Sequence, residues 1–173
     1  VVRWRFRFRR GDELKFRAHL DMVRLFQRAM RRASLPVAYS QGFNPHPRFT
    51  LALPLPLGVT ADCEPGEAYF SEPLDPTLFV EKLNKQLPSS LVIRKASVTP
   101  LEAPALASLV EAAAYSAVLR CSFSGDEEAG AAVGINVLEK ALNNLLAKEE
   151  ILYPRLNKKK KTTYTNVRPY ILE

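Results

Sequence analysis

Five arginines lie within residues 3–10, and four of them, Arg3, Arg5, Arg7 and Arg9, alternate with aromatic side chains. A guanidinium group can bind one phosphate through two parallel hydrogen bonds. Arg3, Arg5 and Arg7 are two residues apart, so on one face of a strand they would repeat about every 6–7 Å. That interval is close to the spacing of phosphates in an extended single strand of nucleic acid. The pattern predicts a phosphate-binding surface, with RNA as the expected partner.

The only two imidazoles of the chain are His19 and His46. Without a set of metal ligands around them, they can serve as acid–base groups or as structural polar residues. His19 is expected near a helix N-terminus beside Asp21, where the helix dipole disfavours the cationic imidazolium. His46 lies between two prolines, in a stiff loop suited to ligand contact. Both are weak candidates for catalysis.

Other kinds of site find little support in the sequence. Cys63 and Cys121 have neither Cys-x-x-Cys nor zinc-site spacing, so we expect free thiols in a reducing cytosol. There is no three-cysteine cluster for an iron–sulfur centre, no Walker A loop and no Gly-rich dinucleotide turn. Asp62 and Glu64 are at most a weak signal for a hard cation. We expect no metal and no cofactor in this chain.

Charge is distributed unevenly along the 173 residues, whose net charge is +7. Residues 1–48 hold 12 basic and 3 acidic side chains, and residues 148–173 hold 7 and 3. The middle, 49–147, holds 6 basic and 12 acidic side chains. A basic surface at the two ends is typical of proteins that bind polyanions.

The first half of the chain alternates extended and helical patterns. Trp4, Phe6 and Phe8 share one face of the first strand, so we expect them to be buried and the arginine face to be open. The expected order is strand, helix, strand, strand, helix, strand, which is the order of a ferredoxin-like α+β sandwich. The corresponding ranges are 2–9, 19–33, 49–57, 66–72, 76–87 and 91–98.

The second half has a weaker pattern of the same kind. Residues 99–114 are expected to connect the halves and to include an Ala-rich helix at 105–114. A partial unit, 115–173, then follows in the order strand, helix, strand, strand. Its expected elements are a strand at 115–123, an acidic turn at 124–128, a helix at 133–148 and a hairpin of 151–155 with 162–167. The first unit, 1–98, is the expected ferredoxin-like basic domain.

The expected RNA-binding residues combine cations with aromatic side chains. Tyr39 and Phe43 could stack on unpaired bases, and the stiff loop 42–48 would contribute shape. The lysine run at the hairpin tip would add charge without sequence specificity. The full set is Arg3, Arg5, Arg7, Arg24, Arg28, Tyr39, Phe43, Asn44, His46, Arg48, Lys158, Lys159, Lys160 and Lys161.

Several motifs resemble a known bacterial family. They are His-Leu-Asp at 19–21, Arg-Arg-Ala at 31–33, GFNPHPR at 42–48 and NVRPYI at 166–171. Together they resemble the radical-SAM-linked uncharacterised domain family, whose members occur beside or fused to B12-binding-type radical SAM proteins. The resemblance implies a radical SAM partner, RNA as a substrate class, and a domain that continues past Glu173. It implies no catalytic residue.

Three functions therefore remain open. The first is an RNA-binding accessory domain that presents RNA to a radical SAM partner. The second is a protein–protein adaptor that docks such an enzyme through the apolar segment 51–57. The third is a metal-independent endoribonuclease using His19 or His46. It is suggested by a weaker likeness, in strand order, basic sheet and helix-start histidine, to the tandem ferredoxin-like CRISPR repeat-processing endoribonucleases.

No run of about 18 apolar residues is present, so no transmembrane helix is expected. The Arg-rich start has no apolar signal-peptide core, and we expect a cytoplasmic protein.

Overall fold

The computed structural model describes residues 1–118, 127–157 and 161–172, with the backbone alone for 127–133. The chain divides into two compact units, Val1–Ala114 and Tyr115–Glu173, and each is described by itself. The first unit holds the larger sheet and two helices. The second holds one helix and a hairpin.

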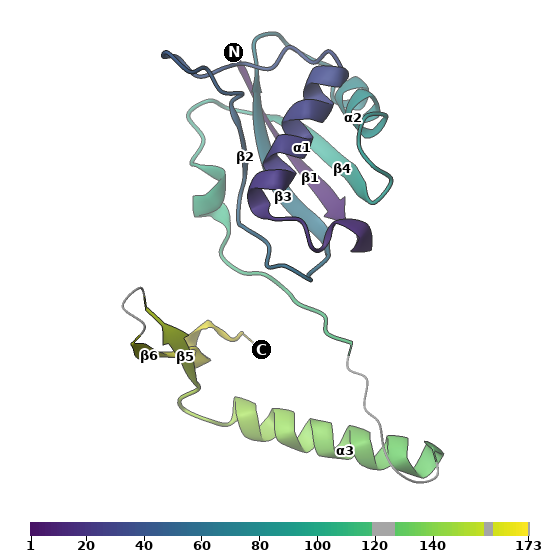
Figure 1. The fold of residues 1–173 in the computed structure, drawn as a ribbon, viewed down its shortest axis with the longest axis vertical. Coiled ribbons are helices and arrows are strands. Elements are labelled where there is room, and N and C mark those ends of the chain that lie inside the picture. Colours follow the sequence, from purple (N-terminus) through teal and green to yellow (C-terminus); the bar gives the residue numbers. More distant parts are fainter. Residues whose placement is uncertain (119–126, 158–160, 173) are drawn as a thin grey trace. The chain divides into compact units, whose positions relative to one another are not determined.

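The first unit is a four-stranded antiparallel sheet with both helices on one face (Figure 1). The strand order is β2-β3-β1-β4, which confirms the ferredoxin-like arrangement. Its elements are β1 (Val2–Arg10), α1 (His19–Arg32), β2 (Phe49–Leu51), β3 (Ala61–Phe70), α2 (Pro76–Asn84) and β4 (Leu91–Thr99).

The core confirms the alternation predicted for the first strand. Trp4, Phe6 and Phe8 of β1 are buried on the face that the helices cover. Phe8 packs edge-on against Phe26 of α1, with 5.0 Å between ring centroids. Trp4 packs against Phe79 of α2 at 5.4 Å. These aromatic contacts hold both helices to the sheet.

The Phe6 ring of β1 packs directly against the main chain of Gly66 in β3. Phe6 is paired with Gly66 across the two strands. A Cβ atom at position 66 would lie 2.5 Å from Cζ of Phe6, well inside van der Waals contact. The absence of a side chain at Gly66 therefore makes room for the Phe6 ring.

One extended segment is shorter than the sequence pattern suggests, and a neighbouring segment pairs only at single residues. The strand expected at 49–57 ends at Leu51, because Pro54 and Pro56 have no N–H to contribute to a ladder. The segment 37–39 forms only isolated bridges, Val37 with Phe70 and Tyr39 with Pro47.

The connection between the two halves also departs from expectation. The Ala-rich helix expected at 105–114 is wrong: only the short turn Leu106–Leu109 is helical. Residues 115–118 form no strand, and 119–123 lie outside the described residues. Ala favours helix locally, but a short segment needs an apolar stripe packed on a core to stay helical.

The second unit contains α3 (Glu127–Leu146), β5 (Leu152–Leu156) and β6 (Thr162–Asn166). β5 and β6 pair in antiparallel register, as expected for the hairpin. The expected acidic turn at 124–128 is in part helical, since α3 includes Glu127; residues 124–126 lie outside the described part, as do Cys121 and Lys158–Lys160. No helix in the described ranges has the length and apolar character needed to cross a membrane.

Candidate nucleic-acid interface

Arg3 does not face solvent, contrary to the expectation for the arginine face of β1. Its side chain is 3% exposed, and Nη2 lies 2.8 Å from Oε2 of Glu67, itself 4% exposed. Glu67 belongs to β3, the neighbouring strand, and points to the same face of the sheet. A buried cation needs such a partner, so Arg3 is a structural residue here.

The segment 100–109, which we call the covering segment, lies over this part of the sheet and closes it to solvent. Arg3 donates hydrogen bonds to the carbonyls of Leu101 (3.1 Å), Pro104 (2.9 Å) and Ala103. Leu106 of the same segment is buried. Figure 1 shows this segment leaving β4 and turning beside the sheet.

Arg5 takes part in the same network. Its Nε donates to Oε2 of Glu67 at 3.0 Å, and its Nη2 donates to the carbonyl of Pro104. Its side chain keeps 20% exposure. Two of the three arginines expected to form the phosphate ladder therefore hold the covering segment in place.

The environment of Glu67 favours its charged form. Burial alone would raise the pKa of Glu67, but hydrogen bonds from Arg3, Arg5 and Tyr69 lower it below its usual range. The carboxylate is thus ionised throughout the neutral range.

The remainder of the open sheet face keeps some free cations. Arg7 is exposed, pairs in register with Lys95 of β4, and approaches Sγ of the exposed Cys63 at 3.4 Å. Arg48 stacks on the ring of Tyr69, with its guanidinium carbon 3.8 Å from the ring centroid. Arg48 is exposed and can still reach a ligand through its outer edge.

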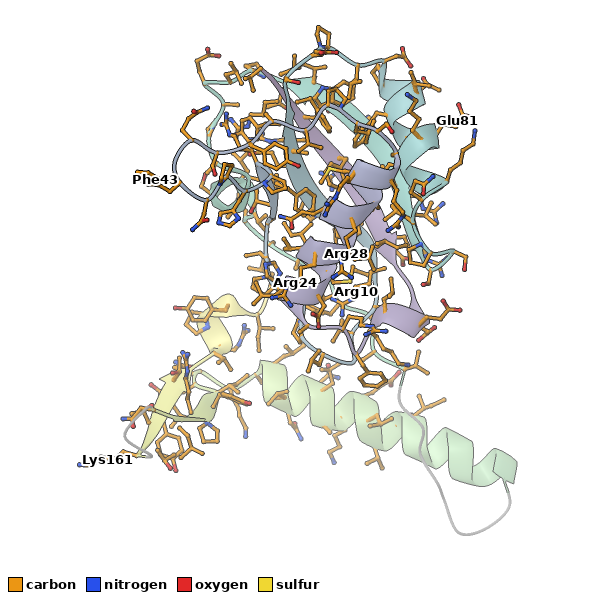
Figure 2. All side chains as sticks on the ribbon, turned by 45° about the horizontal axis from the view of Figure 1, so that its top comes forward. Arg10, Arg24, Arg28, Phe43, Glu81 and Lys161 are labelled. Carbon is orange, nitrogen blue, oxygen red and sulfur yellow. The ribbon has the colours of Figure 1, made fainter. Side chains whose placement is uncertain are left out.

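A second group of cations lies on the opposite side of the unit. Arg24 and Arg28 project from the outer side of α1, away from the sheet (Figure 2). With Arg31 they recur at intervals of four and three residues, so the three share one side of the helix. We call Arg24, Arg28 and Arg31 the α1 arginine row. The one acidic residue of α1 is Asp21, 3.7 Å from Arg24 and well solvated.

The predicted binding residues therefore do not form a single surface. Phe26 of α1 packs on Phe6 and Phe8, so α1 covers the face of β1 opposite to Arg7. Arg7 and the α1 arginine row lie on opposite sides of the sheet. A single strand of RNA bound by both would have to pass around its edge.

The loop 39–48 presents an aromatic side chain to solvent. Phe43 is fully exposed at its tip and points away from the unit (Figure 2). Asn44 and His46 are exposed as well. The main chain is held below the tip, because Ser40 N–H donates to the carbonyl of His46 at 2.8 Å and His46 N–H donates to Oγ of Ser40 at 3.0 Å. Tyr39 is half exposed at the base of the loop.

The last of the predicted cations belongs to the second unit. Lys161 is exposed, and its main chain is bonded to Asn157 at the end of the hairpin. The other three lysines of the run lie outside the described residues.

Three titratable side chains meet at a small hollow that the sequence did not reveal. His19 begins α1, Arg10 ends β1 and Glu64 lies on β3, and all three line the hollow. Its remaining lining is apolar: Phe8, Met22, Leu51, Leu53 and Leu55. Burial raises the pKa of Glu64, and the charge of Arg10 opposes that shift. Only His19 had been singled out as a possible acid–base group, because the register that brings Glu64 beside it cannot be read from local patterns.

The acidic pair considered for a hard cation does not form a site. Asp62 is almost fully exposed and lies 3.6 Å from Arg9, whereas Glu64 faces the hollow. In the part of the chain that the structure describes, no three His, Cys, Asp or Glu side chains gather as metal ligands would.

Comparison with known proteins places the chain in a family. A search of curated proteins finds no match. A family profile described as "Uncharacterized protein conserved in bacteria (DUF2344)" matches residues 3–173. Because that match spans nearly the whole sequence, the chain belongs to this conserved bacterial family.

Proposed function

We propose that this chain is an RNA-binding accessory domain that binds phosphates mainly through the α1 arginine row. The observation that carries the proposal is the arrangement of Arg24, Arg28 and Arg31, exposed on one side of α1, a helix whose one acidic residue is the well-solvated Asp21. Four residues of helix advance by about 6 Å, which matches the spacing between neighbouring phosphates. The arginines of β1 were the first candidates, but Arg3 and Arg5 are committed to Glu67.

The exposed loop would add base contacts. Because Phe43 is fully exposed, its ring does not pack in the core. An unpaired base can therefore stack on it. Such stacking tolerates any base, so it would add affinity without sequence preference. An accessory domain that serves several RNA sites would benefit from that tolerance.

The proposed partner is a radical SAM enzyme, which would act on the RNA that this domain holds. This part of the proposal is supported by the motif resemblance at 19–21, 31–33, 42–48 and 166–171. A docking surface is available in the second unit, where α3 exposes apolar side chains such as Leu138, Leu142 and Leu145. Exposed apolar groups gathered on one element are typical of protein-interaction sites.

The adaptor alternative is favoured by a different observation. In the segment 51–57, Leu53 is 46% and Leu57 63% exposed, although Leu51 is buried. An enzyme could cover these side chains with no RNA involved. In that case the α1 arginine row would contact an acidic protein surface or none.

A salt series with two matched variants tests the proposal. The ligand is a fluorescent single-stranded RNA, and its intactness is checked on a gel after each titration. Arg24/Arg28/Arg31→Glu reverses the α1 arginine row. Arg7/Arg94/Lys95→Glu reverses three exposed cations of β1 and β4 and changes the net charge by the same amount.

We expect wild-type affinity to fall with salt, with a logarithmic slope of about two for three phosphate contacts to a single strand. The α1 variant should lose most of the affinity and of the slope, and the sheet variant should lose much less. Equal losses in both variants would show that only net charge matters. Absence of salt-dependent binding in the wild type would favour the adaptor, and RNA cleaved in excess chelator would favour the endoribonuclease.

A further inference from the structure

The hollow lined by Arg10, His19 and Glu64 lies beside the residues that precede α1, where Arg17 is an exposed cation. Arg10 connects the two regions, since its Nη2 donates to the carbonyls of Leu14 and Arg17 at 2.8 Å. The Arg17 side chain is exposed there, and the α1 arginine row begins at Arg24, seven residues further along the chain. A nucleotide bound at the hollow could therefore place its phosphates near Arg17.

The hollow is small and chemically mixed. It has room for a group of about the size of one water molecule. Its apolar walls include the side chains of Leu51, Leu53 and Leu55, and the polar groups at it are one carboxyl, one imidazole and one guanidinium. A flat base or a whole phosphate is too large for this space. A hydroxyl group attached to a carbon skeleton has the right size.

The polar groups also match a hydroxyl in hydrogen bonding. A hydroxyl donates one hydrogen bond and accepts up to two. The carboxyl oxygens of Glu64 can accept its proton. Arg10 uses Nε and Nη2 for the backbone carbonyls of 14, 15 and 17, and none of its bonds within the described part of the chain uses Nη1. Nη1 and the His19 ring are thus the groups that can donate to the hydroxyl oxygen.

We propose that this hollow binds one ribose 2′-hydroxyl and so distinguishes RNA from DNA. The inference rests on the proposed function, because it supposes that a nucleic acid strand lies on this side of the unit. The 2′-hydroxyl is the group by which a protein tells the two nucleic acids apart at a given site. The leucines of the hollow would contact the carbons of the sugar.

The test compares three oligonucleotides of one sequence: oligouridine, its 2′-deoxy form and its 2′-O-methyl form. The wild type should bind oligouridine about three- to tenfold more tightly than either analogue, as expected for loss of a hydrogen-bonded group. The methyl ether should bind no better than the deoxy form, since it has lost its donor and is larger than the hollow.

Glu64→Met removes the acceptor while filling its space, and it should abolish this preference without weakening binding of the deoxy form. Asp62→Asn is the matched control, because it removes one carboxylate charge from the exposed end of the same strand and should leave the preference intact. His19→Gln, which leaves the carboxyl in place, provides a second variant.

Two results would overturn the inference alone. One is equal affinity of the wild type for all three oligonucleotides, with binding still lost in Arg24/Arg28/Arg31→Glu; the proposed function would then survive alone. The other is a preference that Glu64→Met and His19→Gln both retain, which places the discrimination elsewhere. Failure of the wild type to bind any of the three would overturn the inference and the proposed function together.

Discussion

Arg3 and Glu67 form an ion pair of 2.8 Å on the open face of the sheet, with both side chains almost completely buried. The covering segment lies over this pair and receives three hydrogen bonds from Arg3. In the sequence the arginines of β1 look like a row of free cations, but in the structure two of them, Arg3 and Arg5, hold the covering segment in place. Because Arg3 and Arg5 are engaged in this way, we expect the phosphate contacts on α1 rather than on β1.

Removal of Glu67 should destabilise the first unit strongly. Glu67→Ala leaves the buried guanidinium of Arg3 without its carboxylate, which costs about 3–5 kcal/mol in comparable pairs. Urea unfolding followed by circular dichroism measures the change. Glu81→Ala is the control, since Glu81 pairs with Lys85 at 2.6 Å on the surface and should matter little. Similar losses in the two variants would contradict the structural role of Arg3.

The carboxyl groups of Glu64 and Glu67 should affect the stability of the fold with opposite dependence on pH. Glu67 has a lowered pKa in the folded state, so its contribution is present above about pH 4.5 and is lost as pH falls through its folded pKa. Glu64 has a raised pKa, so it favours folding at low pH and this benefit is lost as pH rises through its folded pKa.

Glu64→Gln should therefore raise the melting temperature at pH 7 and change it little at pH 4, where the wild-type carboxyl is largely protonated. Thermal melts of both proteins across this range measure the difference. A variant that is less stable than wild type at pH 7 would show that attraction to Arg10 outweighs the burial of the carboxylate.

Much of the first unit can be predicted from its sequence, because the patterns there are local. The alternation of Trp4, Phe6 and Phe8 with arginines fixes which face of β1 is buried, and the apolar stripe of α1 fixes what covers it. The partner of Arg3 could not be predicted in this way. Glu67 is 64 positions away, and only the register of β1 with β3 brings the two side chains together.

The hollow was missed for the same reason, since Arg10, His19 and Glu64 come from three different elements. The prediction of a helix at 105–114 is wrong for a different reason. Its alanines favour helix, but the main chain directly before it is held against the sheet by hydrogen bonds from Arg3 and Arg5 to the carbonyls of 101, 103 and 104. Alanine preference alone does not extend the helical turn that follows, Leu106–Leu109, through the rest of the segment.

Gly66 should tolerate no side chain while Phe6 is present. Gly66→Ala places a Cβ atom 2.5 Å from the Phe6 ring and should cost about 1–3 kcal/mol through overpacking. Phe6→Leu should lose stability on its own but should reduce the further cost of Gly66→Ala. Unfolding free energies of the two single variants and the double variant measure this coupling, and strict additivity would contradict the contact.

Phe43 should contribute to RNA affinity but not to stability. Phe43→Ala removes a fully exposed ring, so the melting temperature should stay unchanged while RNA binding weakens by about 1–3 kcal/mol, the range for one stacked base. Phe16→Ala is a matched control, because Phe16 is also largely exposed but lies near Gly58 in a different loop. Equal weakening by both would indicate a general apolar effect.

Arginine side-chain NMR tests most directly the central claim, which is that RNA contacts the α1 arginine row rather than the arginines of β1. The Nε–H resonances of the protein are assigned with single Arg→Lys variants and followed as single-stranded RNA is added. The account predicts that the signals of Arg24, Arg28 and Arg31 shift with increasing RNA, while that of Arg3 stays in place because its guanidinium is enclosed by Glu67 and the covering segment. Shifts confined to Arg7 and the other arginines of β1, with the α1 arginine row unchanged, would contradict it.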